Sequence, residues 1–302
     1  MPFREQKVLL MGRAGCGKTS MRSIVFANHL PRDTRRLEAT VNIEYTNVRF
    51  LDNLVLRVWD CGGHDKMLDN YLSFQRDDMF KHVKVLIFVF DVESKEIQRD
   101  LAYFKGTVDA IQTHSPAASV FCLIHKIDLI PCLKRVEIQN RLEKEILVQA
   151  GSLSVKCFAT TIWDESLYQS WSEIACTLIP YHSALLSTLQ KVCETTDAHQ
   201  CILFEKTTFL ELCSTKGLTS EKWDHLQSEK MSTVLKHFKV STSKSHVQFQ
   251  TMEVSFQGIS IHVAPMSPSL MCMFVFRVPI CPALIHLHVE TARRLFHKQG
   301  CL

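Results

Sequence analysis

The sequence contains no apolar stretch of 18 residues, so no segment is expected to cross a membrane as a helix. Its first residues, MPFRE, lack the apolar region of a signal peptide. Pro2 excludes myristoylation, and Cys301 is not fourth from the end as a prenylation box requires. We therefore expect no direct membrane insertion, and any membrane residence must come from partners.

The chain also lacks a large excess of positive or negative charge: the formal net charge of its 302 residues is only +4. A charge this small gives no reason to expect a nucleic-acid partner. The basic cluster Arg32, Arg35 and Arg36 could form a lipid or nucleic-acid patch. Since Asp33 and Glu38 lie among these arginines, we favour a solvated loop.

The twelve cysteines form no C-x-x-C pair and, with the histidines, no zinc-binding spacing. Several, such as Cys122 and Cys157, lie in apolar runs, where a thiol behaves as a small hydrophobic group. The pattern indicates reduced thiols in a cytoplasmic protein.

The first half of the chain alternates between strand-like and helix-like segments. A near-continuous apolar run such as residues 85–90 is typical of a parallel strand covered on both faces. The order βαββαβαβαβα predicts an α/β domain with a mostly parallel sheet over residues 1–180. The expected strands are 7–11, 43–50, 54–59, 85–90, 119–124 and 155–159, and the expected helices are 18–29, 95–113, 135–150 and 165–178.

The pattern changes after Pro180. Residues 181–302 predict a smaller α+β domain with an antiparallel sheet. The expected helices are 182–193, 221–238 and 282–298, and the expected strands are 201–204, 208–213, 247–254, 258–264 and 270–276.

Residues 12–19 read GRAGCGKT and fit the P-loop pattern G-x-x-x-x-G-K-[ST]. The motif follows an apolar strand and opens a helix, which is the arrangement that phosphate binding needs. Lys18 is expected to reach the β and γ phosphates, and the Thr19 hydroxyl to bind Mg²⁺. A glycine turn before a buried helix is the plainer alternative.

Two further motifs stand at predicted strand ends. Residues 59–63 read WDCGG, where Asp60 can hold Mg²⁺ directly or through water and Gly63 can approach a γ phosphate. Residues 125–128 read HKID, and the Asp128 carboxylate can accept hydrogen bonds from guanine N1 and N2, which adenine does not offer. The three motifs together favour GTP and GDP over ATP, so a P-loop ATPase or kinase is a weaker interpretation.

These motifs, taken with others along the chain, make it resemble the Rag GTPases of the A/B type. The shared segments are MRSI (21–24), DTRRL (33–37), WDCGG (59–63), FDVES (90–94), HKID (125–128), IWDE (162–165), LFE (203–205) and QTMEV (250–254). The resemblance covers nearly the whole chain and is looser after residue 180. A histidine at the start of the base motif, where most small GTPases have asparagine, agrees with this family.

The resemblance implies a Ras-like G domain over residues 1–180 and a roadblock- or longin-like dimerisation domain over residues 181–302. It implies pairing with a C/D-type Rag subunit through the second domain. It also implies a lysosomal or vacuolar scaffold complex, activating and exchange factors, and GTP-dependent recruitment of the TOR kinase complex in response to amino acids.

The resemblance further implies which residues bind GTP or GDP and Mg²⁺. The residues expected at the phosphates are Ala14, Gly15, Gly17, Lys18, Thr19, Ser20 and Gly63. Thr34 and Thr40 fall in the first switch segment, and Thr40 is the better candidate for Mg²⁺ beside Thr19 and Asp60. His125 and Asp128 are expected to hold the base, and Ile162 lies on the loop that closes over it.

The main departure from the family is His64, where the A/B-type members have a glutamine that orients the attacking water. Three interpretations remain open: His64 positions the water itself, it slows hydrolysis and favours the GTP state, or it is neutral because a partner supplies the chemistry. The departure also leaves a second function class open, a scaffold subunit with negligible hydrolysis in which GTP is a structural ligand.

Overall fold

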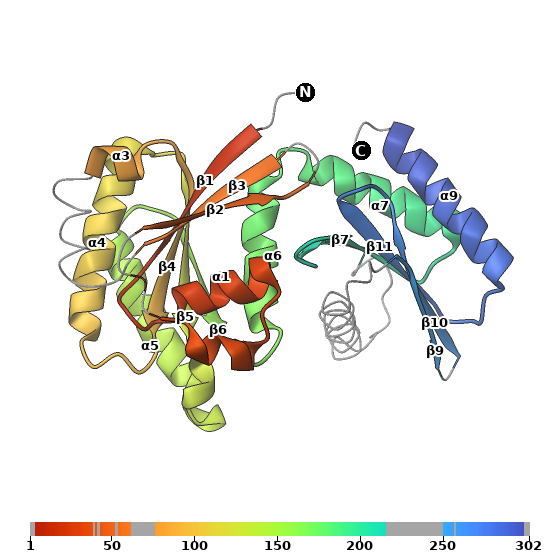
Figure 1. Ribbon diagram of the computed structural model, residues 1–302. Helices are drawn as coiled ribbons and strands as arrows, with labels where there is room; N and C mark the ends of the chain where they lie inside the picture. The colour runs from red at the N-terminus through yellow and green to blue at the C-terminus, as the bar shows by residue number, and fades with distance from the viewer. Residues whose placement is uncertain are drawn as a thin grey trace. The chain divides into compact units, whose positions relative to one another are not determined.

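The computed structural model describes residues 4–38, 40, 43–51, 54–61, 76–215, 250–256 and 258–298 (Figure 1). The chain forms two compact units, residues 1–49 with 53–170 and residues 50–52 with 171–302. The division falls inside helix α6 (Ser166–Leu178), before the boundary expected at Pro180. The domain limits 1–180 and 181–302 therefore stay a prediction.

The first unit is built on a six-stranded sheet in the order β2-β3-β1-β4-β5-β6. All neighbouring strands run parallel except β2, which pairs antiparallel with β3. The strands are β1 (Arg4–Met11), β2 (Glu44–Arg49), β3 (Leu54–Asp60), β4 (Val83–Asp91), β5 (Ser119–His125) and β6 (Val155–Thr160). Because β1, β3, β4, β5 and β6 are parallel, their carboxyl ends meet at one edge of the sheet.

Strand β4 explains why this sheet needs helices on both faces. Its residues 85–90 are all buried, as expected for a central parallel strand. Phe88 and Phe90 pack against Phe104 of helix α4 (Ile97–His114), whose ring centroid lies 5.2 Å from that of Phe88 and 5.5 Å from that of Phe90. Burial of such rings contributes about 1.5–3 kcal/mol each, so this aromatic cluster fixes α4 against the sheet.

Helices cover both faces of the sheet. Figure 1 shows α3, α4 and α5 on one side and α1 with the start of α6 on the other. The helices are α1 (Lys18–Ala27), α3 (Arg76–Phe80), α4 (Ile97–His114), α5 (Cys132–Ala150) and α6, with short 3₁₀ turns η1 (Pro31–Arg36) and η2 (Ile127–Leu129). The turn η1 was not predicted, since a single hexapeptide carries no periodicity; Pro31 at its start fixes φ for it.

The second unit contains a five-stranded antiparallel sheet in the order β8-β7-β11-β10-β9. Helices α7 (His182–Thr196) and α9 (Pro282–Lys298) contact each other, and α7 also contacts β7 and β8. The strands are β7 (Gln200–Glu205), β8 (Glu211–Ser214), β9 (Met252–Phe256), β10 (Ile259–Pro265) and β11 (Leu270–Phe276). The helix expected at 221–238 lies outside the described residues.

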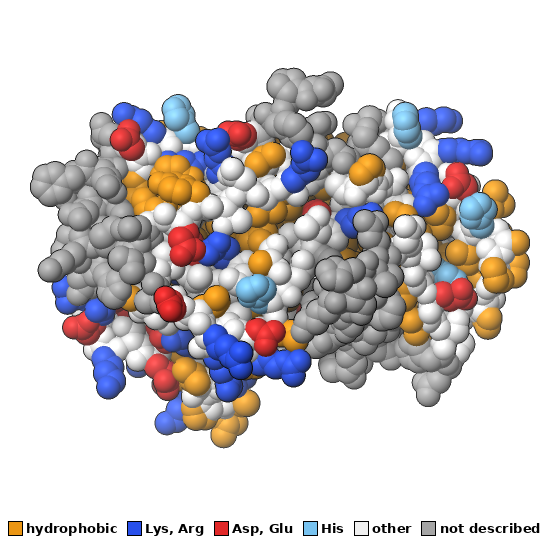
Figure 2. All heavy atoms as spheres, in the orientation of Figure 1, with side chains coloured by type: hydrophobic (Ala, Val, Ile, Leu, Met, Phe, Trp, Pro, Cys, Tyr) orange, Lys and Arg blue, Asp and Glu red, His pale blue; other side chains and the backbone are white. Residues whose placement is uncertain are grey.

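The fold class is confirmed: an α/β unit with a mostly parallel sheet precedes a smaller α+β unit. Within the described ranges, no helix has both the length and the apolar character to span a bilayer. On the visible face, lysines and arginines alternate with acidic side chains (Figure 2). Exposed apolar side chains include Leu133 and Val136 on α5 and Leu284 and Leu287 on α9.

Candidate functional site

The P-loop connects the end of β1 to the start of α1, as the motif predicts. Gly17 precedes the helix with φ +98°, a left-handed conformation that glycine adopts without strain. No acidic residue stands in the first turn of α1, and no side chain caps its amino end. The free N–H groups and the positive end of the helix dipole are therefore available to an anion.

Lys18 lies inside the P-loop. Its Nζ donates to the carbonyl oxygens of Gly12 at 2.8 Å and Arg13 at 2.9 Å. The side chain is buried, and the Sγ atom of Cys16 lies 3.7 Å from Nζ. The loop thus carries a fixed positive charge next to the uncapped helix end, which is the electrostatic arrangement expected of a phosphate site.

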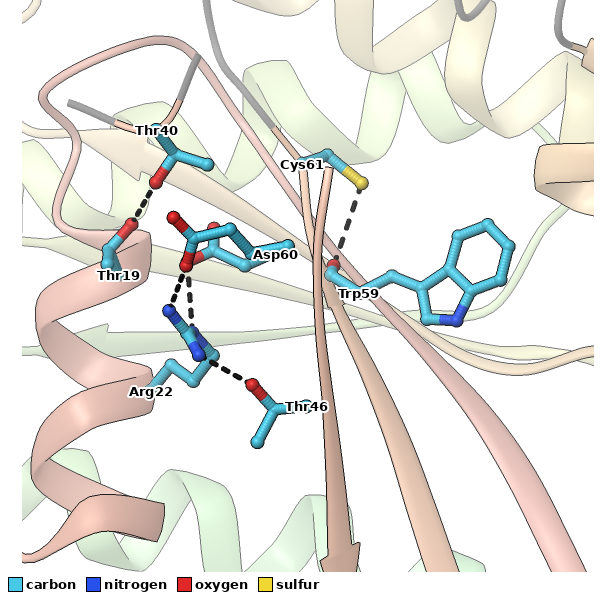
Figure 3. A network of polar contacts seen from close by, with 8 residues as sticks. Thr19, Arg22, Thr40, Thr46, Trp59, Asp60 and Cys61 are labelled. Atoms are coloured by element: carbon cyan, nitrogen blue, oxygen red, sulfur yellow. Dashed lines mark hydrogen bonds and ion pairs between the residues drawn. The ribbon is translucent and has the colours of Figure 1, made fainter. Parts of the chain in front are cut away.

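Three oxygen-bearing side chains expected to bind Mg²⁺ come from separate elements (Figure 3). Thr19 opens α1, Thr40 follows η1, and their hydroxyl oxygens lie 2.7 Å apart. Asp60 ends β3 and is fully buried. Its Oδ2 accepts a hydrogen bond from Nε of Arg22 at 3.1 Å, whereas its Oδ1 has no partner among the described residues.

This donor set fits Mg²⁺, which prefers hard oxygen ligands and keeps several waters. A buried carboxylate oxygen without a hydrogen-bond partner is costly, and a cation or its bound water would satisfy Asp60 Oδ1. The hydroxyls of Thr19 and Thr40 and the free oxygen of Asp60 are the groups that would hold the ion.

Asp128 follows β5, where the base motif was predicted. Its Oδ1 accepts a hydrogen bond of 2.5 Å from the Thr161 hydroxyl. Arg135 of α5 donates to the backbone carbonyls of Asp128 and Ile130. Thr161 therefore orients the carboxylate and Arg135 holds the backbone beside it, and among the described residues no group bonds to the second carboxylate oxygen.

His125 is buried beside the P-loop. It is 2% exposed, and its Nδ1 lies 2.9 Å from the Thr160 hydroxyl. A Cβ added to Gly17 would lie 2.8 Å from His125 Cδ2, so the ring packs directly against the P-loop backbone. His125 thus connects the HKID motif to the phosphate loop.

Burial lowers the pKa of His125 from 6.5 to about 4, with the nearby Lys126 acting in the same direction. The unfolded chain therefore takes up this proton near pH 6.5, whereas the folded chain takes it up only near pH 4. We predict that, as the pH is lowered from about 6.5 to about 4, this histidine reduces the unfolding free energy by roughly 1.4 kcal/mol per pH unit.

The variant His125→Asn keeps a group that can bond to Thr160 but cannot titrate. Denaturant unfolding of the two proteins between pH 4.5 and pH 7 measures the effect. The difference in unfolding free energy should favour the wild type most at pH 7 and shrink steadily toward low pH. A difference that is constant across the range would contradict a neutral, buried His125.

Lys126 and Arg13 are both engaged by acidic side chains. Lys126 Nζ bonds to Asp91 Oδ2 at 2.6 Å. Arg13 turns toward α4, with NH1 2.5 Å from Glu96 Oε2, and lines a pocket of about 450 Å³ beside the P-loop. The P-loop arginine is therefore directed at α4.

The remaining residues predicted to bind the nucleotide differ in how deeply they are buried. Ala14 and Gly15 are exposed on the P-loop, and Ser20 and Ile162 are half-buried. Thr34 is buried, and its hydroxyl donates to the Pro31 carbonyl at 2.7 Å inside η1. Gly63 and His64 lie outside the described residues.

Two residues of the site were missed in the sequence. Thr161 follows β6, and Asp128 follows β5. Because β5 and β6 pair in parallel, the segments after them lie side by side, so Thr161 could have been recognised as a neighbour of Asp128. Arg22 stands three residues after Thr19 and so shares its helix face, but nothing in the spacing identified Asp60 as its partner.

Comparisons with known proteins identify the family of this chain. Residues 7–235 match the family model described as the Gtr1/RagA G protein conserved region. The chain is 46% identical over 292 residues to the GTP-binding protein gtr1 of Schizosaccharomyces pombe, covering 96% of this chain and 94% of that protein. It is 43% identical over 295 residues to the Ras-related GTP-binding protein A of Dictyostelium discoideum, covering 97% of each. It is 40% identical over 306 residues to the GTP-binding protein GTR1 of Saccharomyces cerevisiae, covering 96% of this chain and 98% of that protein. The resemblance drawn from the motifs is confirmed, and the chain belongs to the Gtr1/RagA family of G proteins.

Proposed function

We propose that this chain binds GTP and GDP with Mg²⁺ and hydrolyses GTP slowly, switching its affinity for partners between the two states. The observation that carries the proposal is the contact between His125 and Gly17. This contact joins the HKID motif, which would bind the base, to the P-loop, which would bind the phosphates. The two ends of one nucleotide would therefore contact segments that pack against each other.

Each group has a part in binding. The Asp128 carboxylate would accept from guanine N1 and N2, held in position by Thr161. Lys18 and the N–H groups at the start of α1 would bind the phosphates. Mg²⁺, when bound, would neutralise phosphate charge. Thr19, Thr40 and Asp60 would hold that ion, and the Thr19–Thr40 contact would link the first switch segment to the P-loop.

Hydrolysis is proposed to depend on His64 as the residue that positions the attacking water, with Gly63 near the γ phosphate. Ras-like domains without an arginine finger are slow, and Arg13, the arginine of the P-loop, is engaged by Glu96. Because histidine titrates near neutral pH, the proposal includes a rate that changes between about pH 6 and pH 7.

Two measurements on the purified full chain test this function. GTP and GDP should displace a fluorescent guanine nucleotide at concentrations where ATP does not. Single-turnover phosphate release should then be followed across that pH range, with and without an activating protein. Binding without any phosphate release in either condition would favour the alternative, a scaffold subunit in which GTP is a structural ligand.

We also propose that the chain acts as a heterodimer with a C/D-type Rag subunit through residues 181–302. Family membership supports this proposal, as it does attachment to a lysosomal or vacuolar scaffold complex and signalling of amino-acid availability to the TOR kinase complex. Co-expression of the full chain with candidate C/D-type subunits tests the pairing. A chain that elutes alone with every candidate would contradict it.

A further inference from the structure

Arg22 connects the Mg²⁺-binding groups to strand β2. The residue lies one turn after Thr19 on α1, so the two side chains leave the same face of the helix. Its guanidinium donates from Nε to Asp60 Oδ2 at 3.1 Å and from NH1 to the Thr46 hydroxyl at 2.5 Å. The remaining nitrogen, NH2, pairs with Glu44. Each of the three nitrogens thus has one acceptor, and Figure 3 shows the contacts of Arg22 with Asp60 and Thr46.

Asp60 requires this partner because its side chain is fully buried, whereas the Arg22 side chain remains 17% exposed. A carboxylate taken out of water is costly unless a cation and hydrogen bonds compensate it. Within the part of the chain that the structure describes, Arg22 is the cation paired with Asp60. It occupies one carboxylate oxygen and leaves Oδ1 unpartnered.

The other two contacts reach β2, which begins four residues after Thr40. Glu44 pairs with Asp60 in the antiparallel register of β2 and β3, and Thr46 pairs with Val58. Arg22 therefore fixes Asp60 to the strand that follows the segment carrying Thr40. In Figure 3, Asp60 lies between the Thr19–Thr40 pair and Arg22.

We propose that Arg22 is the counter-ion of Asp60 and holds its carboxylate in position. Through this contact, Arg22 would make the retention of bound nucleotide less dependent on Mg²⁺. The proposal rests on the function proposed above and deepens it. When Mg²⁺ is removed, an uncompensated Asp60 carboxylate repels the phosphates through a poorly screened interior. The guanidinium on Oδ2 reduces that repulsion and keeps the carboxylate in its orientation.

The test measures release of a fluorescent GDP from the full chain in excess Mg²⁺ and in EDTA. In the variant Arg22→Met, the ratio of the EDTA rate to the Mg²⁺ rate should rise about tenfold over the wild type, the size expected for losing a hydrogen bond to a charged group. Arg22→Lys, which keeps a charge without the planar fork, should give a smaller rise.

Two variants control for the position of the effect. Thr46→Val removes a contact of Arg22 with β2 but leaves its bond to Asp60, so its ratio should stay within about twofold of the wild type. In the background of Asp60→Asn, adding Arg22→Met should change the ratio little, because no carboxylate charge remains to be compensated.

The outcomes separate the two proposals. Equal acceleration of release in Mg²⁺ and EDTA, in both Arg22→Met and Arg22→Lys, would mean that Arg22 acts on general stability and would overturn the inference. An unchanged ratio in both variants would overturn it as well. A wild-type chain that binds no GDP would instead refute the proposed function itself.

Discussion

Replacing Asp128 by Asn should lower the affinity for GTP by about a hundredfold or more and transfer the preference to xanthosine triphosphate. Asp128 offers a carboxylate that can accept from two donors of guanine, and each hydrogen bond to a charged group is worth about 1.5–3 kcal/mol. An asparagine presents an N–H₂ group to one of these donors. Xanthine carries an oxygen in place of the guanine amino group, so it accepts where guanine donates. Competition binding with both nucleotides measures the change.

The variant Thr161→Ala serves as the matched control. It removes the hydroxyl that bonds to Asp128 Oδ1 but leaves the carboxylate able to accept from guanine. It should weaken GTP binding by only about fivefold to tenfold, because the lost bond orients the carboxylate and is not one of its bonds to the base, and it should not create a preference for xanthine. If Asp128→Asn also leaves the base preference unchanged, Asp128 does not read the base.

The positions of the phosphate and base motifs could be predicted because each follows an apolar strand. Residues 85–90 and 120–124 are buried, as expected for strands with parallel neighbours on both sides, and the ends of parallel strands meet at one edge. Asp60 and His125 each end a strand of the sheet, and the P-loop follows β1 directly. Local spacing and strand periodicity were sufficient for this part of the site.

The contacts of Arg22 and His125 could not be predicted in the same way. The partner of Arg22 is 38 residues away in the sequence, and a helix face does not reveal which strand it covers. His125 was expected at the base because of its motif, and the motif does not reveal the direction of its ring, which packs against Gly17 of the P-loop. That direction follows from the packing of β5 beside the P-loop, which the sequence pattern does not contain.

The variant Gly12→Ala should destabilise the G-domain unit by about 2–6 kcal/mol, because two costs coincide at this glycine. Gly12 has φ +139°, which side chains rarely adopt, and an added Cβ would lie 2.4 Å from the Val89 carbonyl oxygen. Val89 belongs to β4, which is paired on both sides, so its backbone cannot move away.

Gly15→Ala is the matched control, since Gly15 also has positive φ, +80°, but no atom lies within 4 Å of the added Cβ. That variant carries only the backbone cost, about 1–2 kcal/mol. Denaturant unfolding of the full chain compares the two, and equal losses would show that the close approach of the P-loop to β4 contributes nothing.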